Sequence, residues 1–521
     1  MHGSETYYVV GEGLLSEANE NGAGPARALA SATAASATAA TAPPFRFSRL
    51  APKGTQLGDP ARRKLALAMT EGGGGFGDVP AGYTYFGQFV DHDLTFDKTT
   101  VAFGQNVSAA DLRQGRSPAL DLDSLYGAGP ANPGSAKFYK DDRHLKMGKS
   151  EPADGIPAKQ GFDLPRDDKA LIPDKRNDEN LAVAQTHLAF HRFHNRVVDT
   201  ALPPGTPANQ RFIRAGEIVV KHYQWVIRHD YLPRILEPSV VDDVFTNGRK
   251  AFEKNAVATD VPTLPIEFSV AAFRLGHSMI RRDYAWNKEF PDDQGTLDFL
   301  FIFSGLSGFV GGGSRLPSNW IADWRRLYDL TETGRNDLKA PAGQFNVARR
   351  IDTLLSDPLK ILPRGSFGGK AADEGTIRAN LAFRNLTRAK MVKLATGQKA
   401  VDFLKAKGVS VNAVAKAKLR DGNGGASLAG LTAAQRDKVL TNTPLWFYIL
   451  REAELNDGRL KGVGARIVAE TIHRAMEGSR FSIVRDPAWR PMLGPNNTTF
   501  RMSDLLLFAF DGKKDLLAPL G

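Results

Sequence analysis

The chain has 521 residues, of which 24% are charged and 42% hydrophobic, the composition of an ordinary globular protein with a large core. Its formal net charge of +11 indicates attraction to anions, but there is no Lys/Arg-rich run or interleaved aromatic platform, so we predict no nucleic-acid partner. The absence of cysteine excludes disulfides and cysteine-ligated metals, and no apolar run approaches the roughly 18 residues of a membrane span.

Residues 1–44 contain an Ala/Ser/Thr-rich stretch without large apolar groups, which predicts an N-terminal linker or wrapping arm. From residue 45 to residue 521 the composition is even, which favours one large domain. Apolar residues recur there at three- and four-residue spacing, and alternating strand patterns are scarce. The sequence therefore predicts a mainly α-helical domain with few short strands, with helices over 179–201, 209–236, 267–282, 376–393 and 461–477.

The segment "YTYFGQFVDHDLTFD", residues 83–97, places two aspartates and a histidine among apolar neighbours. Polar groups in such surroundings are hydrogen-bonded, bound to a metal or catalytic. If 85–96 is helical, Gln88 and His92 share one face and Asp91 lies beside them. A lone histidine on an apolar face is usually a satisfied core residue, so this segment decides nothing by itself.

The next segment, residues 174–199, carries Arg176 and Glu179 three apart at the head of a predicted helix. Alone, these are a helix-start acid and a solvated arginine. The same helix carries His187, His191 and His194, whose spacing suits a metal-binding face. A histidine-ligated metal hydrolase is therefore a rival hypothesis, although no glutamate follows the first histidine and no fourth ligand is obvious.

Two later segments complete the pattern. "EFSVAAFRLGHSMIRR" sets His277 in a predicted apolar helix with Arg274 three residues earlier, and "NLAFRNLTRAK" carries Asn385 and Arg388 three apart. Together with "FGQFVDHDLT" and "RNDEN…H…HNR", these segments resemble, in family order, the signatures of the animal-type haem peroxidases, or peroxidase–cyclooxygenase superfamily. The resemblance extends over about residues 44–511 and is loosest at "RNLTR".

The resemblance implies a haem b cofactor between two sets of side chains. His277 matches the proximal histidine that binds haem iron, and Asn385 matches the amide that accepts a hydrogen bond from its other ring nitrogen. On the opposite side, His92 matches the distal base that relays a peroxide proton. Arg176 matches the distal arginine that stabilises developing negative charge. Gln88 matches the amide that orients water or a halide.

Further residues match positions around the haem edge. Arg274 and Arg388 are expected to pair with the haem propionates, because guanidinium forks suit carboxylates. Asp91 and Glu179 match the residues that form ester bonds to haem methyl groups in mammalian members, so the sequence permits covalent attachment. The alternative is that both are plain hydrogen-bonded acids. Asn180 stands where the strongest chloride oxidisers carry a haem-linked methionine, which favours donors other than chloride.

A second cofactor follows from the same resemblance. The loop "SPALDLDSLYG", residues 117–127, together with the aspartate after His92, resembles the family's calcium site. Calcium takes six to eight hard oxygen ligands, and an alternating loop offers one at every second residue. The expected ligands are the side chains of four residues and the carbonyl of a fifth: Asp93, Ser117, Asp121, Asp123 and Ala119. The alternative is a solvated acidic turn.

The resemblance implies an oxidoreductase that reduces hydrogen peroxide through a ferryl intermediate and oxidises halide, thiocyanate or small phenolic donors. A fatty-acid dioxygenase of the same fold is one alternative, but cyclooxygenases carry a tyrosine where this chain has Arg274. A non-catalytic haem-binding paralogue is the other. It is disfavoured because His92, Arg176 and His277 are all present.

The biological setting is less constrained. The lack of cysteine, and hence of the disulfides of mammalian secreted relatives, favours a bacterial member. A role in the response to oxidative stress would follow from peroxide reduction. The expected calcium site favours an extracellular or periplasmic location, although no ordinary secretory signal is visible. The physiological donor and the oligomeric state stay open.

Overall fold

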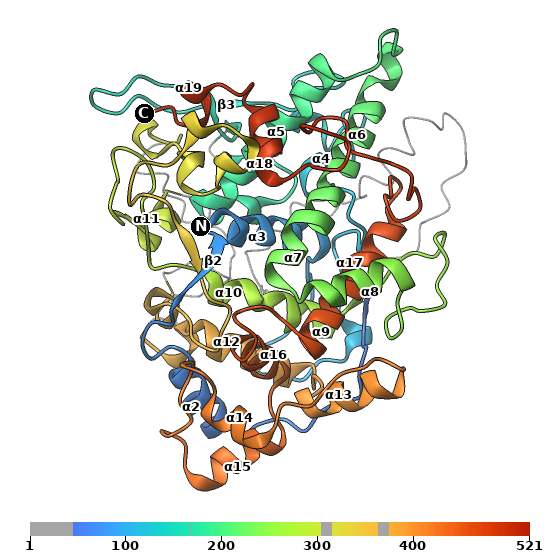
Figure 1. Ribbon diagram of the computed structural model, residues 1–521, viewed down its shortest axis with the longest axis vertical. Helices are drawn as coiled ribbons and strands as arrows, with labels where there is room; N and C mark the ends of the chain where they lie inside the picture. The colour runs from blue at the N-terminus through green and yellow to red at the C-terminus, as the bar shows by residue number, and fades with distance from the viewer. Residues whose placement is uncertain (1–44, 168, 304–314, 363–372, 374) are drawn as a thin grey trace.

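The structure is a computed structural model that describes residues 45–167, 169–303, 315–362, 373 and 375–521. The predicted N-terminal arm, residues 1–44, lies outside the described residues. Figure 1 shows helices throughout the body of the molecule, with only short strands between them. The prediction of a mainly α-helical fold with few short strands is therefore confirmed.

The helices of the first half of the described chain are α2 (Asp59–Met69), α3 (Gly82–Leu94), α4 (Asp123–Tyr126), α5 (Leu181–Thr200), α6 (Arg211–Val226), α7 (Leu232–Ile235), α8 (Pro238–Asn247), α9 (Ile266–Ser269) and α10 (Gly276–Met279). Those of the second half are α11 (Leu297–Ile302), α12 (Leu381–Met391), α13 (Gly397–Ala406), α14 (Lys416–Asp421), α15 (Ala433–Thr441), α16 (Leu445–Glu454), α17 (Gly462–Gly478), α18 (Met502–Ala509) and α19 (Lys514–Leu517). They enclose a large cluster of buried hydrophobic side chains.

The described strands form two-stranded pairs. β1 (Phe47–Ser48) runs parallel to β7 (Leu264–Pro265). The antiparallel pairs are β2 (Phe76–Pro80) with β10 (Val347–Arg349), β3 (Gly148–Lys149) with β4 (Gln160–Asp163), β5 (Arg166–Asp167) with β6 (Lys169–Ala170), and β8 (Asp283–Tyr284) with β9 (Gly295–Thr296). Strands this short tie chain segments together but build no extended sheet.

Helices α3 and α5 pack against each other at the centre of the molecule (Figure 1). Phe89 of α3 is fully buried, and its ring stacks on that of Phe190 of α5 with 4.6 Å between centroids. Almost every residue of α3 is buried, so the helix touches protein on all sides. Its polar side chains must therefore find partners inside the protein.

Three of the predicted helices correspond to α5, α12 and α17. Helix α5 begins later than predicted because Asn180 caps it, its Oδ1 accepting a hydrogen bond from the Val183 amide at 2.9 Å. Arg176 and Glu179 therefore precede the helix and belong to the 3-10 turn Lys175–Asp178 and its end. The fourth prediction, 209–236, corresponds to α6, a π-helical segment and α7.

The prediction of one helix over 267–282 is wrong. The chain forms α9, a 3-10 turn at Ala272–Leu275, and α10. It leaves helical geometry at Ala271, where φ is −137° and ψ is −68°. Helical periodicity could not reveal this bend because the residues on both sides of it are apolar and buried. The bend separates Arg274 and His277 from the first half of the segment.

None of the described helices is long and apolar enough to cross a membrane.

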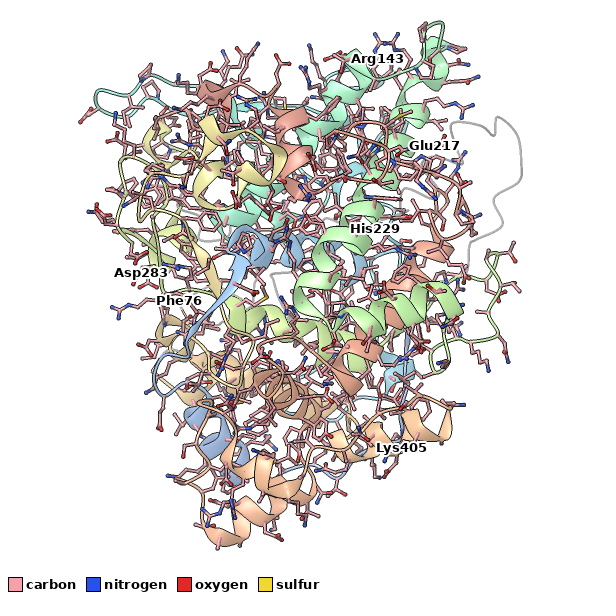
Figure 2. The ribbon with its side chains drawn as sticks, in the orientation of Figure 1. Phe76, Arg143, Glu217, His229, Asp283 and Lys405 are labelled. Atoms are coloured by element: carbon pink, nitrogen blue, oxygen red, sulfur yellow. The ribbon has the colours of Figure 1, made fainter. Side chains whose placement is uncertain are left out.

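The packing of α3 on α5 predicts a large stability loss for Phe89→Ala. Removing a buried phenylalanine leaves a cavity and should lower the free energy of unfolding by about 3–5 kcal/mol. Denaturant unfolding measures this difference. Phe76→Ala is the matched control, because Phe76 is 62% exposed (labelled in Figure 2) and should cost less than about 1 kcal/mol. Equal losses in the two variants would contradict the packing.

Candidate active site

A cavity of about 40 Å³ lies between α3 and the segment that contains α10. Part of the wall is polar and includes Gln88 and Asp91 from α3 and Arg274 and His277 from the opposite segment. The rest is largely aromatic or aliphatic: Tyr85, Tyr231, Phe273, Ile280, Leu297 and Phe301. The cavity thus brings together residues from three of the four segments singled out in the sequence, namely 83–97, 174–199 and 267–282.

On one side of the cavity, His277, Asn385 and Arg274 form a hydrogen-bonded chain. Asn385 Nδ2 lies 2.9 Å from His277 Nδ1, and Asn385 Oδ1 accepts a hydrogen bond from Arg274 Nη1 at 2.8 Å. Arg274 Nε also donates to the Ser269 carbonyl at 2.9 Å. The predicted partnership of His277 with Asn385 is therefore present, and α12 supplies its second member.

The direction of that hydrogen bond differs from the prediction. We expected Asn385 to accept from His277, but its NH2 group faces the ring. The physical reason is Arg274, which has only donors and therefore takes the amide oxygen. With Nδ1 accepting, the neutral imidazole carries its proton on Nε2. An iron-bound Nε2 needs the opposite tautomer, and hence the Asn385 amide turned over and Arg274 released from it.

On α3, His92 follows the cavity-lining Asp91 and is fully buried, but it does not itself line the cavity. Its Nδ1 is 2.9 Å from Asn177 Oδ1, and its Nε2 is 3.6 Å from Glu179 Oε1. Because an amide oxygen only accepts, Asn177 holds the proton on Nδ1 and leaves Nε2 as the basic nitrogen. The sequence reasoning missed Asn177, and its place within "RNDEN", beside Arg176, was the available signal.

Gln88 connects the cavity wall to this buried group. Its Nε2 donates to Glu179 Oε1, and its Oε1 accepts from Asn180 Nδ2 at 3.0 Å. Asp91 lies on the wall one turn further along α3, and its Oδ2 accepts from the Thr95 hydroxyl at 3.2 Å. The acids predicted to flank the cofactor, Asp91 and Glu179, are thus placed by α3 and by the turn before α5.

Arg176 does not line the cavity. Its Nη2 donates to the backbone carbonyls of His92 at 3.0 Å and Thr95 at 2.5 Å, at the end of α3. Its guanidinium also pairs with Asp174 at 2.6 Å and lies 4.6 Å from the centroid of the Phe96 ring. The arginine therefore supports the backbone of His92 directly.

Asp174 holds two buried arginines. Besides Arg176, it pairs with Arg116 at 2.8 Å, and all three side chains are less than one-tenth exposed. Burial alone would raise the pKa of Asp174, but the two arginines together outweigh it and hold the pKa well below its ordinary value. The carboxylate therefore stays ionised throughout the pH range in which proteins are folded.

Arg388 of α12 is a buried cation with spare hydrogen-bonding capacity. Its Nη2 pairs with Asp97, whereas its Nε and Nη1 have no hydrogen-bond partner within the described part of the chain. Burial lowers the pKa of Arg388 to about 10, against the opposing effect of Asp97. Buried donors without acceptors are costly, so this guanidinium fits a further anionic group.

Comparison with known proteins agrees with this arrangement. The family model described as animal haem peroxidase matches residues 111–300. Human thyroid peroxidase is 28% identical over 233 residues, which are 40% of this chain and 24% of that protein. These matches make the chain similar to the animal haem peroxidases of the peroxidase–cyclooxygenase superfamily. The match spans only about a quarter of thyroid peroxidase, so the activity of the whole relative does not transfer by itself.

Solved structures share the fold of this protein over nearly the whole chain. Peroxidase A from Dictyostelium discoideum has a TM-score of 0.57 at 14% sequence identity, covering 91% of this chain and 94% of that one. A fatty acid alpha-dioxygenase from Arabidopsis thaliana also has a TM-score of 0.57, at 12% identity, covering 91% and 78%. At such identities the likeness concerns the fold alone, and both enzyme classes of the superfamily share it.

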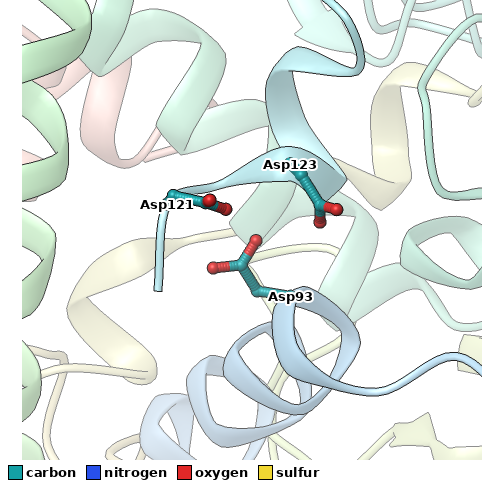
Figure 3. A group of neighbouring side chains, drawn as sticks. All are labelled: Asp93, Asp121 and Asp123. Carbon is teal, nitrogen blue, oxygen red and sulfur yellow. The ribbon is translucent and has the colours of Figure 1, made fainter. Parts of the chain in front are cut away.

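Three aspartates of the predicted calcium site lie close together. Carboxylate oxygens of Asp93, Asp121 and Asp123 lie within 4.8 Å of one another, and all three residues are buried (Figure 3). Leu122 adopts a left-handed backbone conformation, φ 61°, which turns the chain between the two loop aspartates. Burial raises the pKa of Asp93 to about 8 and that of Asp123 to about 6. The alternative of a solvated acidic turn is wrong.

The other two predicted calcium ligands lie in the same loop. Ser117 donates through Oγ to Asp121 Oδ2 at 3.2 Å and through its amide to Asp123 Oδ2 at 3.0 Å. The Ala119 carbonyl accepts from the Asp121 amide at 3.0 Å. Asp121 Oδ1 accepts no hydrogen bond from the described residues, although it is buried. These oxygens form an oxygen-rich set that suits a hard cation.

The rival metal site on α5 does not form. His194 is satisfied on both nitrogens, by the Tyr126 hydroxyl at 2.9 Å and the Arg143 carbonyl at 2.8 Å. His191 Nδ1 is bonded to the Lys146 carbonyl at 2.9 Å. In the chain segments that the structure describes, the three histidines are not among the groups with metal-ligand spacing.

The buried ion pairs of Asp174 predict a pH-dependent stability loss in Asp174→Asn. Leaving two buried arginines without their shared carboxylate should cost about 3–5 kcal/mol at pH 7. Because the folded-state pKa lies below the unfolded value of about 3.9, this stabilisation is present above about pH 4 and is lost as the pH falls further. Denaturant unfolding as a function of pH measures the difference between variant and wild type.

The control for this experiment is Asp337→Asn, which removes a solvent-exposed partner of Arg335. Exposed pairs are screened by water and salt, so this variant should change stability far less. A loss in Asp174→Asn that persists unchanged at acidic pH would contradict the electrostatic explanation.

Proposed function

We propose that this protein is a haem-dependent peroxidase that reduces hydrogen peroxide and oxidises a small electron donor. The observation that carries the proposal is the opposition of two side-chain sets across one cavity. His277 and Arg274 contribute to one wall, Gln88 and Asp91 contribute to the other, and His92 follows Asp91 on α3. The match of residues 111–300 to the animal haem peroxidase family model supports the same conclusion.

The residues present fit a haem. The cavity offers an imidazole, His277, on a wall that is otherwise largely apolar. Arg388 has two buried N–H positions without acceptors in the described chain, as a site for a propionate requires. Arg274 is a second candidate, since it would be released when the Asn385 amide turns to accept from His277. Asp91 and Glu179 are the carboxylates that we propose would form ester links.

When bound, haem would supply an iron centre able to accept and return electrons. The chain itself moves the protons. His92 Nε2, made basic by the hydrogen bond from Nδ1 to Asn177, takes a proton from one peroxide oxygen and returns it to the other, so that water can leave. Arg176 holds the His92 backbone and adds a fixed positive charge beside it. Gln88 orients water or donor at the wall.

Small donors fit this cavity best. Its aromatic wall, with Tyr85, Phe273 and Phe301, favours phenolic donors, and bromide, iodide or thiocyanate are small enough to enter. Fatty-acid dioxygenation is the second candidate function, favoured by the fold shared with a plant alpha-dioxygenase. Arg274 occupies the position of the cyclooxygenase tyrosine and bonds Asn385 instead. Oxygen uptake with a fatty acid, measured beside donor oxidation with peroxide, separates the two functions.

The proposal predicts that His92→Ala slows the reaction with peroxide. Losing a positioned acid–base group typically costs about 10²–10⁴-fold in rate, while haem should still bind through His277. Stopped-flow rates against peroxide concentration, with haem content from the absorption spectrum, give both quantities. His144→Ala is the control, because His144 is a surface histidine paired with Asp141 and Asp199. If His92→Ala reacts as fast as wild type, the proposed base is wrong.

We further propose that Asp93, Asp121 and Asp123, with Ser117 and the Ala119 carbonyl, bind calcium. The buried carboxylates and the spare Asp121 oxygen support this proposal. Asp93 follows His92 on α3, so the cation would hold the end of the distal helix in place. A calcium site of this kind suits an extracellular or periplasmic protein, where calcium is plentiful, and we propose that location on this ground.

Removal of calcium should lower both the melting temperature and peroxidase turnover, because three buried carboxylates would lose their counterion. Thermal unfolding with and without a chelator, followed by calcium addition, measures the effect. Asp121→Asn should have a lower melting temperature in calcium and a weaker response to the chelator. The exposed Asp142→Asn serves as its matched control. A chelated wild-type protein with unchanged stability would contradict the site.

A further inference from the structure

Tyr83 forms a short hydrogen bond with a buried carboxylate close to the cavity. The residue lies on α3 beside the cavity-lining Thr84 and is 1% exposed. Its hydroxyl donates to Asp230 Oδ2 at 2.5 Å. Asp230 also accepts from Arg234 Nε at 2.8 Å and from the Met502 amide at 2.9 Å. Charge-assisted O–H···O⁻ bonds of this length are strong.

One aromatic ring separates Tyr83 from the cavity. Tyr231 lines the cavity wall, and its ring is stacked with that of Tyr83, 6.4 Å between centroids and 13° from parallel. Burial and the charge of Asp230 raise the pKa of Tyr83 well above its ordinary value. The phenol therefore keeps its proton, and the hydrogen bond, at every pH at which the protein is folded.

We propose that Tyr83 is a redox-active side chain, which gives one electron through Tyr231 to the oxidised cofactor while its phenolic proton passes to Asp230. This inference rests on the proposed peroxidase function, which supplies the oxidant.

The step balances in atoms and charge. The O–H bond of Tyr83 breaks, the proton forms a bond to Asp230 Oδ2, and the electron reduces the cofactor by one equivalent. The product is a neutral tyrosyl radical beside a neutral carboxylic acid. A one-electron donor, such as a phenol, then returns an electron to Tyr83 as Asp230 returns the proton, and the initial state is restored.

The surrounding charge favours this coupled route. The Arg234 guanidinium lies 4.6 Å from the Tyr83 ring centroid, so a ring that lost its electron but kept its proton would face a second positive charge. Transfer of the proton to Asp230 leaves the ring neutral. Arg234 also pairs with Glu332 at 3.0 Å, and both side chains are partly exposed. The Arg234–Glu332 ion pair thus lies between the Tyr83–Asp230 pair and the protein surface.

Neighbouring tyrosines lack a proton acceptor of this kind. Tyr328 packs edge-on to Tyr83 at 5.1 Å and is equally buried, but its hydroxyl has no hydrogen-bond partner among the described residues. Tyr85 lines the cavity and donates to the Tyr284 hydroxyl at 2.7 Å. That acceptor is a neutral phenol rather than a base. Proximity to the cavity would favour Tyr85, whereas proton transfer favours Tyr83.

The test is to treat the haem-loaded protein with hydrogen peroxide in the presence of a nitroso spin trap and to locate the adduct by peptide mass spectrometry. The adduct is expected on Tyr83. Tyr83→Phe should lose it, and so should Asp230→Asn, whose amide still accepts a hydrogen bond but is a far weaker proton acceptor. Tyr328→Phe, the matched control, should keep it. Circular dichroism and haem absorption check that each variant is folded and loaded.

Peroxide consumption in the same samples distinguishes the possible failures. Wild-type protein that consumes peroxide but is trapped at Tyr85, at Tyr328 or at no tyrosine would overturn the role of Tyr83 and leave the peroxidase proposal standing. Retention of the Tyr83 adduct in a folded Asp230→Asn variant would overturn the proton-transfer step. Haem-loaded protein that consumes no peroxide would overturn the proposed function and this inference with it.

Discussion

The burial of helix α3 on all sides ties the rest of the structure together. A helix with one solvated face can turn its polar side chains to water, but α3 has almost no such face. Each polar group along it must reach another segment of the chain, because an unsatisfied buried polar group costs about 1–3 kcal/mol. Tyr83 reaches Asp230, Gln88 reaches Glu179, His92 reaches Asn177, and Asp93 reaches the loop that follows.

This constraint explains why the proposed activities are neighbours. Residues 83–93 contribute in succession to four features. These are the proposed electron and proton transfer at Tyr83, the cavity wall, the proposed base His92 and the proposed cation site. A change in the cation site would therefore alter the position of His92, which precedes Asp93 on the same rigid helix. Arg176 reinforces the connection from outside, since it holds the His92 and Thr95 carbonyls while Asp174 holds the arginine.

Each of the two histidines beside the cavity has an amide side chain as a partner. On the His92 side, Asn177 Oδ1 faces Nδ1, Glu179 lies near Nε2, and Arg176 holds the backbone carbonyl. On the His277 side, the Asn385 amide has two orientations, and Arg274 favours the one that leaves the proton on Nε2. Under the proposed function, haem binding and the orientation of this amide would therefore be coupled. Anions that draw Arg274 away from Asn385 would favour the tautomer that can bind iron.

The sequence alone determined the resemblance to the animal haem peroxidases, the helical class and the segments that meet, because these depend on residue identity, spacing and periodicity, which are local properties. It also determined that Asp93, Asp121 and Asp123 belong together, through the resemblance of one loop. Only the tertiary structure decided the bend at Ala271, the direction of the Asn385 hydrogen bond, and the withdrawal of Arg176 from the cavity wall. Each of these depends on which partner a buried group finds across the fold. The bend is hidden from helical periodicity because the residues around it are packed on all sides. Arg274 takes the Asn385 oxygen, while Asp174 and two backbone carbonyls hold Arg176. The pairing of Tyr83 with Asp230 belongs with them, since 147 residues separate the two and only the packing of α3 against the π-helical segment brings them within hydrogen-bonding distance.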